Sequence, residues 1–473
     1  MALNGIFKAW PYIASIVLTK GLSVVTIPVL TGYMKPEDVG YLDVIASIVE
    51  FIGLICALGL ADTLFRFSGT QSSEAERNKE TAAITGSALL ITFILGSAVQ
   101  LFLPLIVSAW NLPVNIYALR LSVLGATLAG LIELPLAWLR LGNRPLWFFF
   151  FTASRGILQA IAMVAFLMNG YGLDAILAAN GTLDIILTAS LLFLQIKKSG
   201  AHLSRKGFQR TFHFGLPLVG GALAMFALGS CDRWFLVTAI TPETLAHYSI
   251  AVKLALAAPI LLQPFGLWWH AKRIGVLEQK NGLAFSADAT LLGFWILIIG
   301  ALGTALTAPI FIIWFLPESY TPAIAYIPWL ILCFSMNELC SLFNVGSYRA
   351  RHGFYVLIVN TVGGGTAIAG YALLVSSYGV AGAIVATLLG QSVRFTLFIS
   401  FFHRRAPIPY RLGFMSIFTL LAVTAIVLQP AYSTLPIQFA YAIAWGLIML
   451  GAGLGVAFKI KGRHVFSLSG VGT

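Results

Sequence analysis

The residues best placed to do chemistry are basic side chains that interrupt long apolar stretches. Lys20, Arg155, Lys253 and Arg394 each lie near the middle of such a stretch. A charge at the centre of a bilayer costs from about 2.5 kcal/mol upward, so each should face the bundle interior or water. The four cations therefore predict the wall of an anion-binding, substrate-binding cavity. The alternative for each is a buried salt bridge or carbonyl contact that holds helices together.

Polar residues accompany these cations at helical spacing, which places them on the same helix face. They are Thr152 and Gln159 for Arg155, Thr387 and Gln391 for Arg394, Ser249 for Lys253, and the stripe Tyr12, Ser15, Thr19, Ser23 and Thr26 beside Lys20. Arg120 and Arg233 are secondary candidates, because they lie closer to the predicted external ends of their spans and long basic side chains there can reach the headgroups. Asp232 beside Arg233 predicts an ion pair at a helix end.

Acidic residues within the apolar stretches could neutralise the cations or relay protons. They are Asp43, Glu50, Glu133, Asp184 and Glu338. Of these, Glu50, Asp184 and Glu338 are candidates for proton coupling, with Glu50 first. The residue types alone leave open which acid pairs with which cation.

Nothing in the sequence predicts an enzyme. The four cysteines lie inside apolar stretches without a CxxC pair, and the histidines form no cluster. We therefore expect no catalytic residue, no metal site and no cofactor. A membrane glycosyltransferase, polymerase or ligase would need acids or histidines on a sizeable external loop, and no predicted external loop is long enough.

The elements that position these residues are membrane-spanning helices. Hydrophobic residues make up 59% of the chain and charged residues only 10%, against about 25% charged in soluble domains. The apolar stretches are about twenty residues long, which is the length that crosses about 30 Å of hydrocarbon. The predicted fold is an all-α polytopic membrane protein with about fourteen spans. The spans lie near 10–31, 39–64, 81–108, 114–139, 145–168, 172–195, 212–236, 244–268, 286–314, 322–345, 354–375, 378–402, 412–428 and 435–458.

The basic residues predict the orientation of these spans, since cytoplasmic loops carry the excess of Lys and Arg. With both termini cytoplasmic, 22 of the 29 basic residues fall on the cytoplasmic side and one, Lys35, on the other. The net charge of +12 then reflects topology and contact with anionic membrane lipids, and we expect no nucleic-acid partner.

An internal repeat divides the chain into two lobes. Tyr171-Gly172 before one apolar helix matches Tyr378-Gly379 before another, and Lys197-Lys198 at its end matches Arg404-Arg405, all at an offset of 207 residues. Pro36-Glu37 also matches Pro242-Glu243. We predict an N-terminal lobe at 1–206 (six spans), a C-terminal lobe at 207–410 (six spans), and two further spans with a cytoplasmic tail at 411–473. Two six-helix lobes in a parallel pseudo-twofold repeat imply a central cavity and a rocking, alternating-access transporter.

Two stretches resemble a known family. LTKGLSVVTIPVLTGYMKPEDVGYLDVIASIVEFIGLICALGLADTLFRF (18–67) resembles the start of Wzx-type polysaccharide flippases, with its P-E-D-x-G turn and a second span ending in G-L-x-x-x-L-x-R-F. SCDRWFLVTAITPETLAHYSIAVKLA (230–255) is similar to that family's seventh and eighth spans. The resemblance implies the multidrug/oligosaccharidyl-lipid/polysaccharide exporter fold in a bacterial inner membrane.

The resemblance also implies a cargo and partners. The cargo would be an undecaprenyl-diphosphate-linked oligosaccharide, moved from the cytoplasmic to the external leaflet for lipopolysaccharide or exopolysaccharide synthesis, with a polysaccharide polymerase and a chain-length regulator as partners. A diphosphate needs cations, which agrees with the four mid-depth basic residues. A peptidoglycan-precursor flippase and a drug or metabolite antiporter of the same superfamily remain alternatives.

Overall fold

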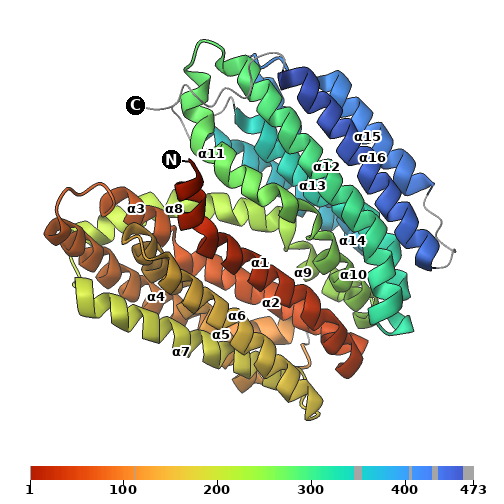
Figure 1. The fold of residues 1–473 in the computed structure, drawn as a ribbon. Coiled ribbons are helices and arrows are strands. Elements are labelled where there is room, and N and C mark those ends of the chain that lie inside the picture. The colour runs from red at the N-terminus through yellow and green to blue at the C-terminus, as the bar shows by residue number, and fades with distance from the viewer. Residues whose placement is uncertain (1, 111, 346–353, 404–406, 429–434, 462–473) are drawn as a thin grey trace. The chain divides into compact units, whose positions relative to one another are not determined.

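The computed structural model describes residues 2–110, 112–345, 354–403, 407–428 and 435–461, which form helices and no strand. The helices run in the order α1 (Ala2–Tyr33), α2 (Pro36–Ala57), α3 (Leu60–Phe67), α4 (Glu74–Trp110), α5 (Ile116–Leu141), α6 (Pro145–Met168), α7 (Leu173–Ser199), α8 (Arg205–Gly229), α9 (Asp232–Ala239), α10 (Pro242–Ala255), η1 (Ala258–Leu262), α11 (Gln263–Leu277), α12 (Gly282–Phe315), η2 (Glu318–Tyr326), α13 (Ile327–Phe343), α14 (Phe354–His403), α15 (Leu412–Val427) and α16 (Leu435–Lys461) (Figure 1).

The helices confirm the all-α polytopic prediction. Within the described ranges, eleven helical segments are long and apolar enough to cross a membrane, and two shorter apolar helices cover Val17–Tyr33 and Leu412–Ile426. The long segment Tyr355–Phe401 covers two predicted spans, and its helix is interrupted at Gly379, where φ is 52° and ψ is −127°. Each predicted span therefore falls on a helix of the structure. The predicted cytoplasmic residues Arg349, Arg351, Arg404, Arg405 and Arg463 lie outside the described ranges.

The chain forms two compact units, Met1–Ala246 and His247–Thr473. In the first unit, α5 packs against α2, α4 and α7, and α1 packs mainly on α6. Glycines allow the closest approach, because a Cβ on Gly125 of α5 would lie 2.6 Å from the Cα of Gly181 on α7. Small residues at such crossings let two membrane helices touch along their backbones.

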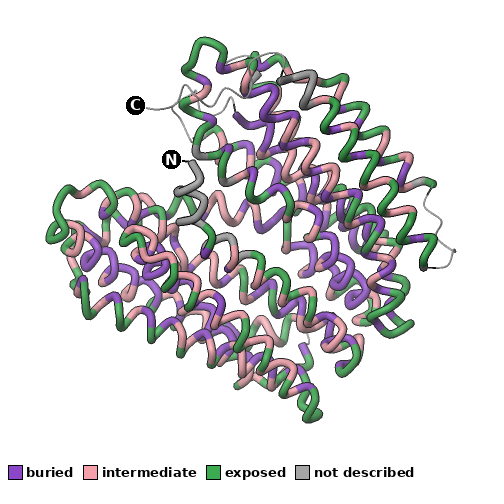
Figure 2. The backbone as a smooth tube through the Cα atoms, viewed as in Figure 1, coloured by how far each residue is buried: buried purple, intermediate pink, exposed green. Residues whose placement is uncertain are grey.

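In the second unit, α12 is the central helix and packs against α11, α13, α15 and α16. The Trp295 indole of α12 donates a hydrogen bond to the Met449 carbonyl of α16 at 2.9 Å. Exposed residues run along the length of α15 and α16 (Figure 2), and they include large apolar side chains such as Leu420 and Leu447, 67% and 63% exposed. Such faces suit lipid rather than water.

The sequence repeat falls on corresponding helix starts. Gly172 precedes α7 and Gly379 marks the break in α14, while Pro36 and Pro242 are the first residues of α2 and α10. The lobe boundaries at 206/207 and 410/411 stay a prediction. The division into compact units falls later, after Ala246, because α8 and α9 pack against α2.

Candidate functional site

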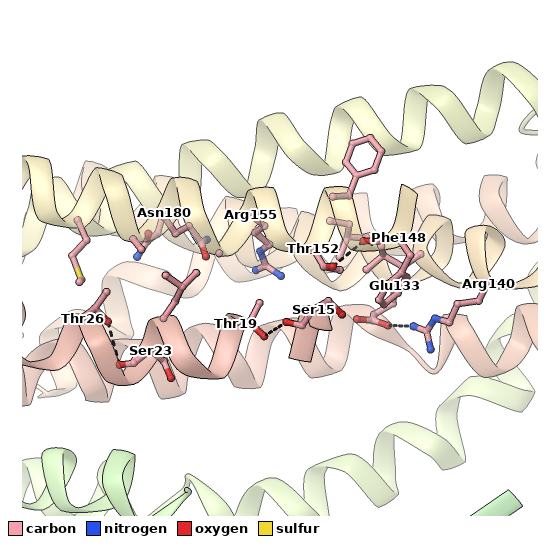
Figure 3. A pocket seen from close by; sticks show the side chains of 18 residues that line it. Ser15, Thr19, Ser23, Thr26, Glu133, Arg140, Phe148, Thr152, Arg155 and Asn180 are labelled. Atoms are coloured by element: carbon pink, nitrogen blue, oxygen red, sulfur yellow. Dashed lines mark hydrogen bonds and ion pairs between the residues drawn. The ribbon is translucent and has the colours of Figure 1, made fainter. Parts of the chain in front are cut away.

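A pocket of about 530 Å³ lies inside the first unit, between α1, α5, α6 and α7 (Figure 3). Its polar lining residues are Ser15, Thr19, Ser23, Thr26, Glu133, Arg140, Thr152, Arg155, Gln159 and Asn180. From Ser15 to Thr26 the pocket follows α1 for about 16 Å at 1.5 Å per residue, or half of the hydrocarbon thickness. Apolar side chains such as Leu22, Ile132 and Met163 complete the walls.

The hydroxyl groups of the pocket are oriented by their own helices. Ser23 and Thr26 donate to the carbonyls of Lys20 and Ser23 at 2.8 and 3.1 Å, and Thr152 donates to the Phe148 carbonyl at 2.8 Å. A hydroxyl has one proton to donate, so in this arrangement these three oxygens are left to accept hydrogen bonds from a ligand. Ligand groups that donate, such as sugar hydroxyls, would suit this wall.

Arg155 is the cation of the pocket and is paired with Asp184 of α7. Its Nε donates to Asp184 Oδ1 at 2.7 Å and its second terminal nitrogen donates to Oδ2 at 3.1 Å, while Gln159 donates to Oδ1 at 2.9 Å. The Arg155 side chain is 36% exposed and that of Asp184 only 9%. A guanidinium has five N–H donors, so three remain for a ligand. Asp184 thus fixes the orientation of Arg155 without using all of its N–H donors.

A second ion pair marks the predicted cytoplasmic end of the pocket. Arg140 lies 3.6 Å from Glu133, with both side chains partly exposed. The Arg140 guanidinium also lies over Phe65 and Phe148, at 5.7 and 5.1 Å from the ring centroids. In Figure 3 this pair lies at one end of the pocket and Thr26 at the other, with Arg155 between them.

The other three primary cations lie apart from this pocket. Lys20 is exposed on α1, and Lys253 is half-buried on α10. Arg394 of α14 is only 5% exposed. Its donors reach three amide oxygens, those of Asn360 at 3.0 Å, Asn337 at 2.9 Å and Gln391 at 2.6 Å. Binding of substrate by these residues stays a prediction, and for Arg394 the structure shows the alternative role of joining helices.

The prediction that the Arg233 side chain reaches the lipid headgroups is wrong. The residue is 6% exposed, and its guanidinium bonds to Asp43 of α2 at 2.6 Å and to Asp232 at 2.9 Å. The Asp232–Arg233 ion pair predicted from the sequence is confirmed. Arg233 turns inward because α9 packs on α2, where Asp43 is buried. Arg120 is exposed on α5, as the sequence predicts.

The proton-coupling candidates have different surroundings. Glu50 is exposed on α2 and accepts a hydrogen bond from Ser230 at 2.9 Å. Asp184 is held by Arg155 and Gln159, as above. Glu338 is half-buried on α13, 3.5 Å from the Asn337 amide. Of the three, Glu50 is the most exposed.

The sequence did not point to Asn180, Asn360 or the pairing of Glu133 with Arg140. Asn180 lies one turn before Asp184 on α7, so the helical face of that acid could have indicated it. Asn360 carries no such signal, since only the packing of α14 brings it to Arg394. The polar stripe of α1 was found from its spacing alone.

Comparisons with known proteins found one matching family model and several similar structures. A family model described as "Polysaccharide biosynthesis protein" matches residues 8–267, which include both stretches that resemble Wzx-type flippases. No curated protein sequence matches the chain.

The structure is similar to that of the lipid II flippase MurJ in an inward closed conformation. The TM-score is 0.74 at 14% identity, covering 96% of this chain and 100% of that one. An inward-facing multidrug MATE transporter of the MOP superfamily gives 0.57 at 14% identity, covering 85% and 95%. The MATE multidrug transporter DinF-BH gives 0.57 at 13% identity, covering 84% and 94%.

At these identities the likeness shows the fold alone, which is the fold of MurJ and of the MATE transporters. The family model covers more than half of the sequence. The chain therefore belongs to the polysaccharide biosynthesis protein family.

Proposed function

We propose that this protein flips an undecaprenyl-diphosphate-linked oligosaccharide from the cytoplasmic to the external leaflet of a bacterial inner membrane. The pocket of the first unit carries the proposal. Its hydroxyl oxygens accept hydrogen bonds, while Arg155 offers three N–H donors beside them. A sugar diphosphate has hydroxyl donors and anionic acceptors, so its chemistry matches both walls.

The cargo requires translocation rather than catalysis. A diphosphate and its sugars cannot cross hydrocarbon unaided, whereas the lipid tail can stay in the bilayer. Alternating access would expose a polar cavity first to the cytoplasm and then to the outside. Lys20, which is exposed here, would add positive charge to the path, and so would Lys253 and Arg394 in conformations that expose them. A polymerase and a chain-length regulator would receive the flipped product.

The test is transport by the full chain in proteoliposomes. A fluorescent undecaprenyl-diphosphate oligosaccharide in the inner leaflet should become accessible to an added glycosidase only when the protein is present. Lipid II and a cationic rhodamine dye serve as parallel cargoes, because the similar structures are named for a lipid II flippase and a multidrug transporter. Flipping of lipid II alone would replace the proposal with a peptidoglycan-precursor flippase, and export of the dye alone with a drug antiporter.

A further inference from the structure

Two arginines converge on one aromatic ring at an end of the first unit. The guanidinium carbons of Arg66 on α3 and Arg210 on α8 each lie 5.9 Å from the centroid of Phe67. Arg66 also lies 4.8 Å from the centroid of Phe214. The two rings meet edge to face at 5.7 Å, so Arg66 lies against both rings and Arg210 against one of them.

The positive charge of this cluster exceeds its negative charge. Arg210 bonds to both carboxylate oxygens of Glu80, at 3.1 and 3.2 Å. Arg66 makes no ion pair with a described residue, and Asp62, one turn earlier on the same helix, does not reach it. Arg66 and Arg210 thus bring two positive charges to the Phe67 ring, and Glu80 offsets only that of Arg210. Like charges repel, and a bound anion would relieve this repulsion.

The cluster lies at a membrane boundary that the sequence predicts to be cytoplasmic. Arg66 is in the last turn of α3, where the second span ends, and Arg210 is near the start of α8, just before the seventh span. Phe65, next to Arg66, contacts Arg140, which lines the pocket of Arg155. The cluster and the pocket therefore meet at the same side of the unit.

We propose that Arg66 and Arg210 form a diphosphate-binding site on the cytoplasmic face, at which the headgroup of the cargo docks before it enters the pocket. This inference rests on the proposed function. The planar donors of arginine match the oxygens of a phosphate in pairs. Stacking on Phe67 and Phe214 orients these donors in advance, so less side-chain freedom is lost on binding.

The test measures binding of inorganic pyrophosphate and farnesyl diphosphate to the full chain in phosphatidylcholine nanodiscs. Arg66→Ala should weaken both by about tenfold or more, because hydrogen bonds to charged groups are the strong ones. Glu80→Gln should tighten binding, since it removes the carboxylate that competes for Arg210. Arg205→Ala is the matched control, because Arg205 is an exposed cation at the start of α8, the helix that carries Arg210. It should change the affinity for either ligand by less than about twofold.

Unchanged pyrophosphate affinity in Arg66→Ala would overturn the site. The site would also be overturned if Arg66→Ala changed only the difference in behaviour between phosphatidylglycerol and phosphatidylcholine nanodiscs. The cluster would then bind membrane headgroups. The site and the function fail separately. If the wild-type protein flips no oligosaccharide while pyrophosphate binding still depends on Arg66, the binding site is supported and the proposed function is refuted. If the protein flips oligosaccharide normally while pyrophosphate binding does not depend on Arg66, the function is supported and the binding site is refuted.

Discussion

Substitutions of Arg155 and Asp184 can separate the contribution of their ion pair to stability from the contribution of Arg155 to transport. Arg155→Ala leaves Asp184, 9% exposed, without its cation. Stranding one partner of a fully buried pair costs about 3–5 kcal/mol. Arg155 is 36% exposed and Gln159 still donates to Asp184, so water and the amide offset part of this cost. We expect a loss of about 2 kcal/mol in stability.

Adding Asp184→Asn to Arg155→Ala removes the stranded charge and should recover at least about 1 kcal/mol. Transport should behave differently. Both the single and the double variant lack the three free N–H donors, and hydrogen bonds to charged groups contribute about 1.5–3 kcal/mol each, so flipping at low cargo concentration should fall by tenfold or more. Arg155→Lys should keep partial activity as a point charge without the two-pronged donor geometry.

The assay pairs thermal unfolding of the full chain in detergent with flipping in proteoliposomes. Arg144→Ala is the control, because it removes a cation that precedes the same helix and stacks on Trp138 without an ion pair in the described structure. Recovery of both stability and transport in the double variant would show that Arg155 acts only through Asp184. Wild-type transport by Arg155→Ala would refute the site.

Four further predictions concern other parts of the chain. Glu50→Gln should slow flipping at neutral pH if Glu50 relays protons, and unchanged flipping with an intact pH response would dismiss it. Arg233→Ala should lower stability by about 3–5 kcal/mol, because it removes the cation that bonds to two buried carboxylates; a wild-type unfolding midpoint would contradict this. Gly379→Ala should cost about 1–3 kcal/mol, since the φ of 52° and ψ of −127° there suit glycine, and Gly413→Ala, with open space around it, is its control. A reporter fused after Thr473, which lies outside the described residues, should be active only in its cytoplasmic form.

The fold could be predicted almost completely because the bilayer imposes it. A span must be apolar and about twenty residues long, and its backbone must bond within itself. These constraints act on each helix separately, so composition and loop charges suffice to find it. The breaks inside spans were less visible. Leu58 adopts a φ of 40° beside Gly59 at 57°, and this interruption between α2 and α3 shows no sequence signal beyond one glycine.

The presence of a charged side chain within a helical span could also be predicted, but its direction could not. The sequence places Arg155 and Asp184 within two consecutive spans. Whether they face one another depends on the rotation of α6 and α7 about their axes, which close glycine contacts between α5 and α7 help to set. Arg233 was misjudged for the same reason, since only the packing of α9 on α2 brings Asp43 to it.

The ion pairs that the sequence could not predict bear on the selectivity of the pocket. A count of the cations within spans overstates the positive field, because Asp184 offsets Arg155, and Arg233 lies between two carboxylates. Under the proposed function, attraction of a diphosphate would depend less on net charge than on fixed N–H donors that the acids leave free. A neutral pair with oriented donors also costs less to hold in a membrane when the pocket is empty. If Arg155 binds the cargo as proposed, its pairing with Asp184 would thus allow the protein to keep that arginine within a span between transport cycles.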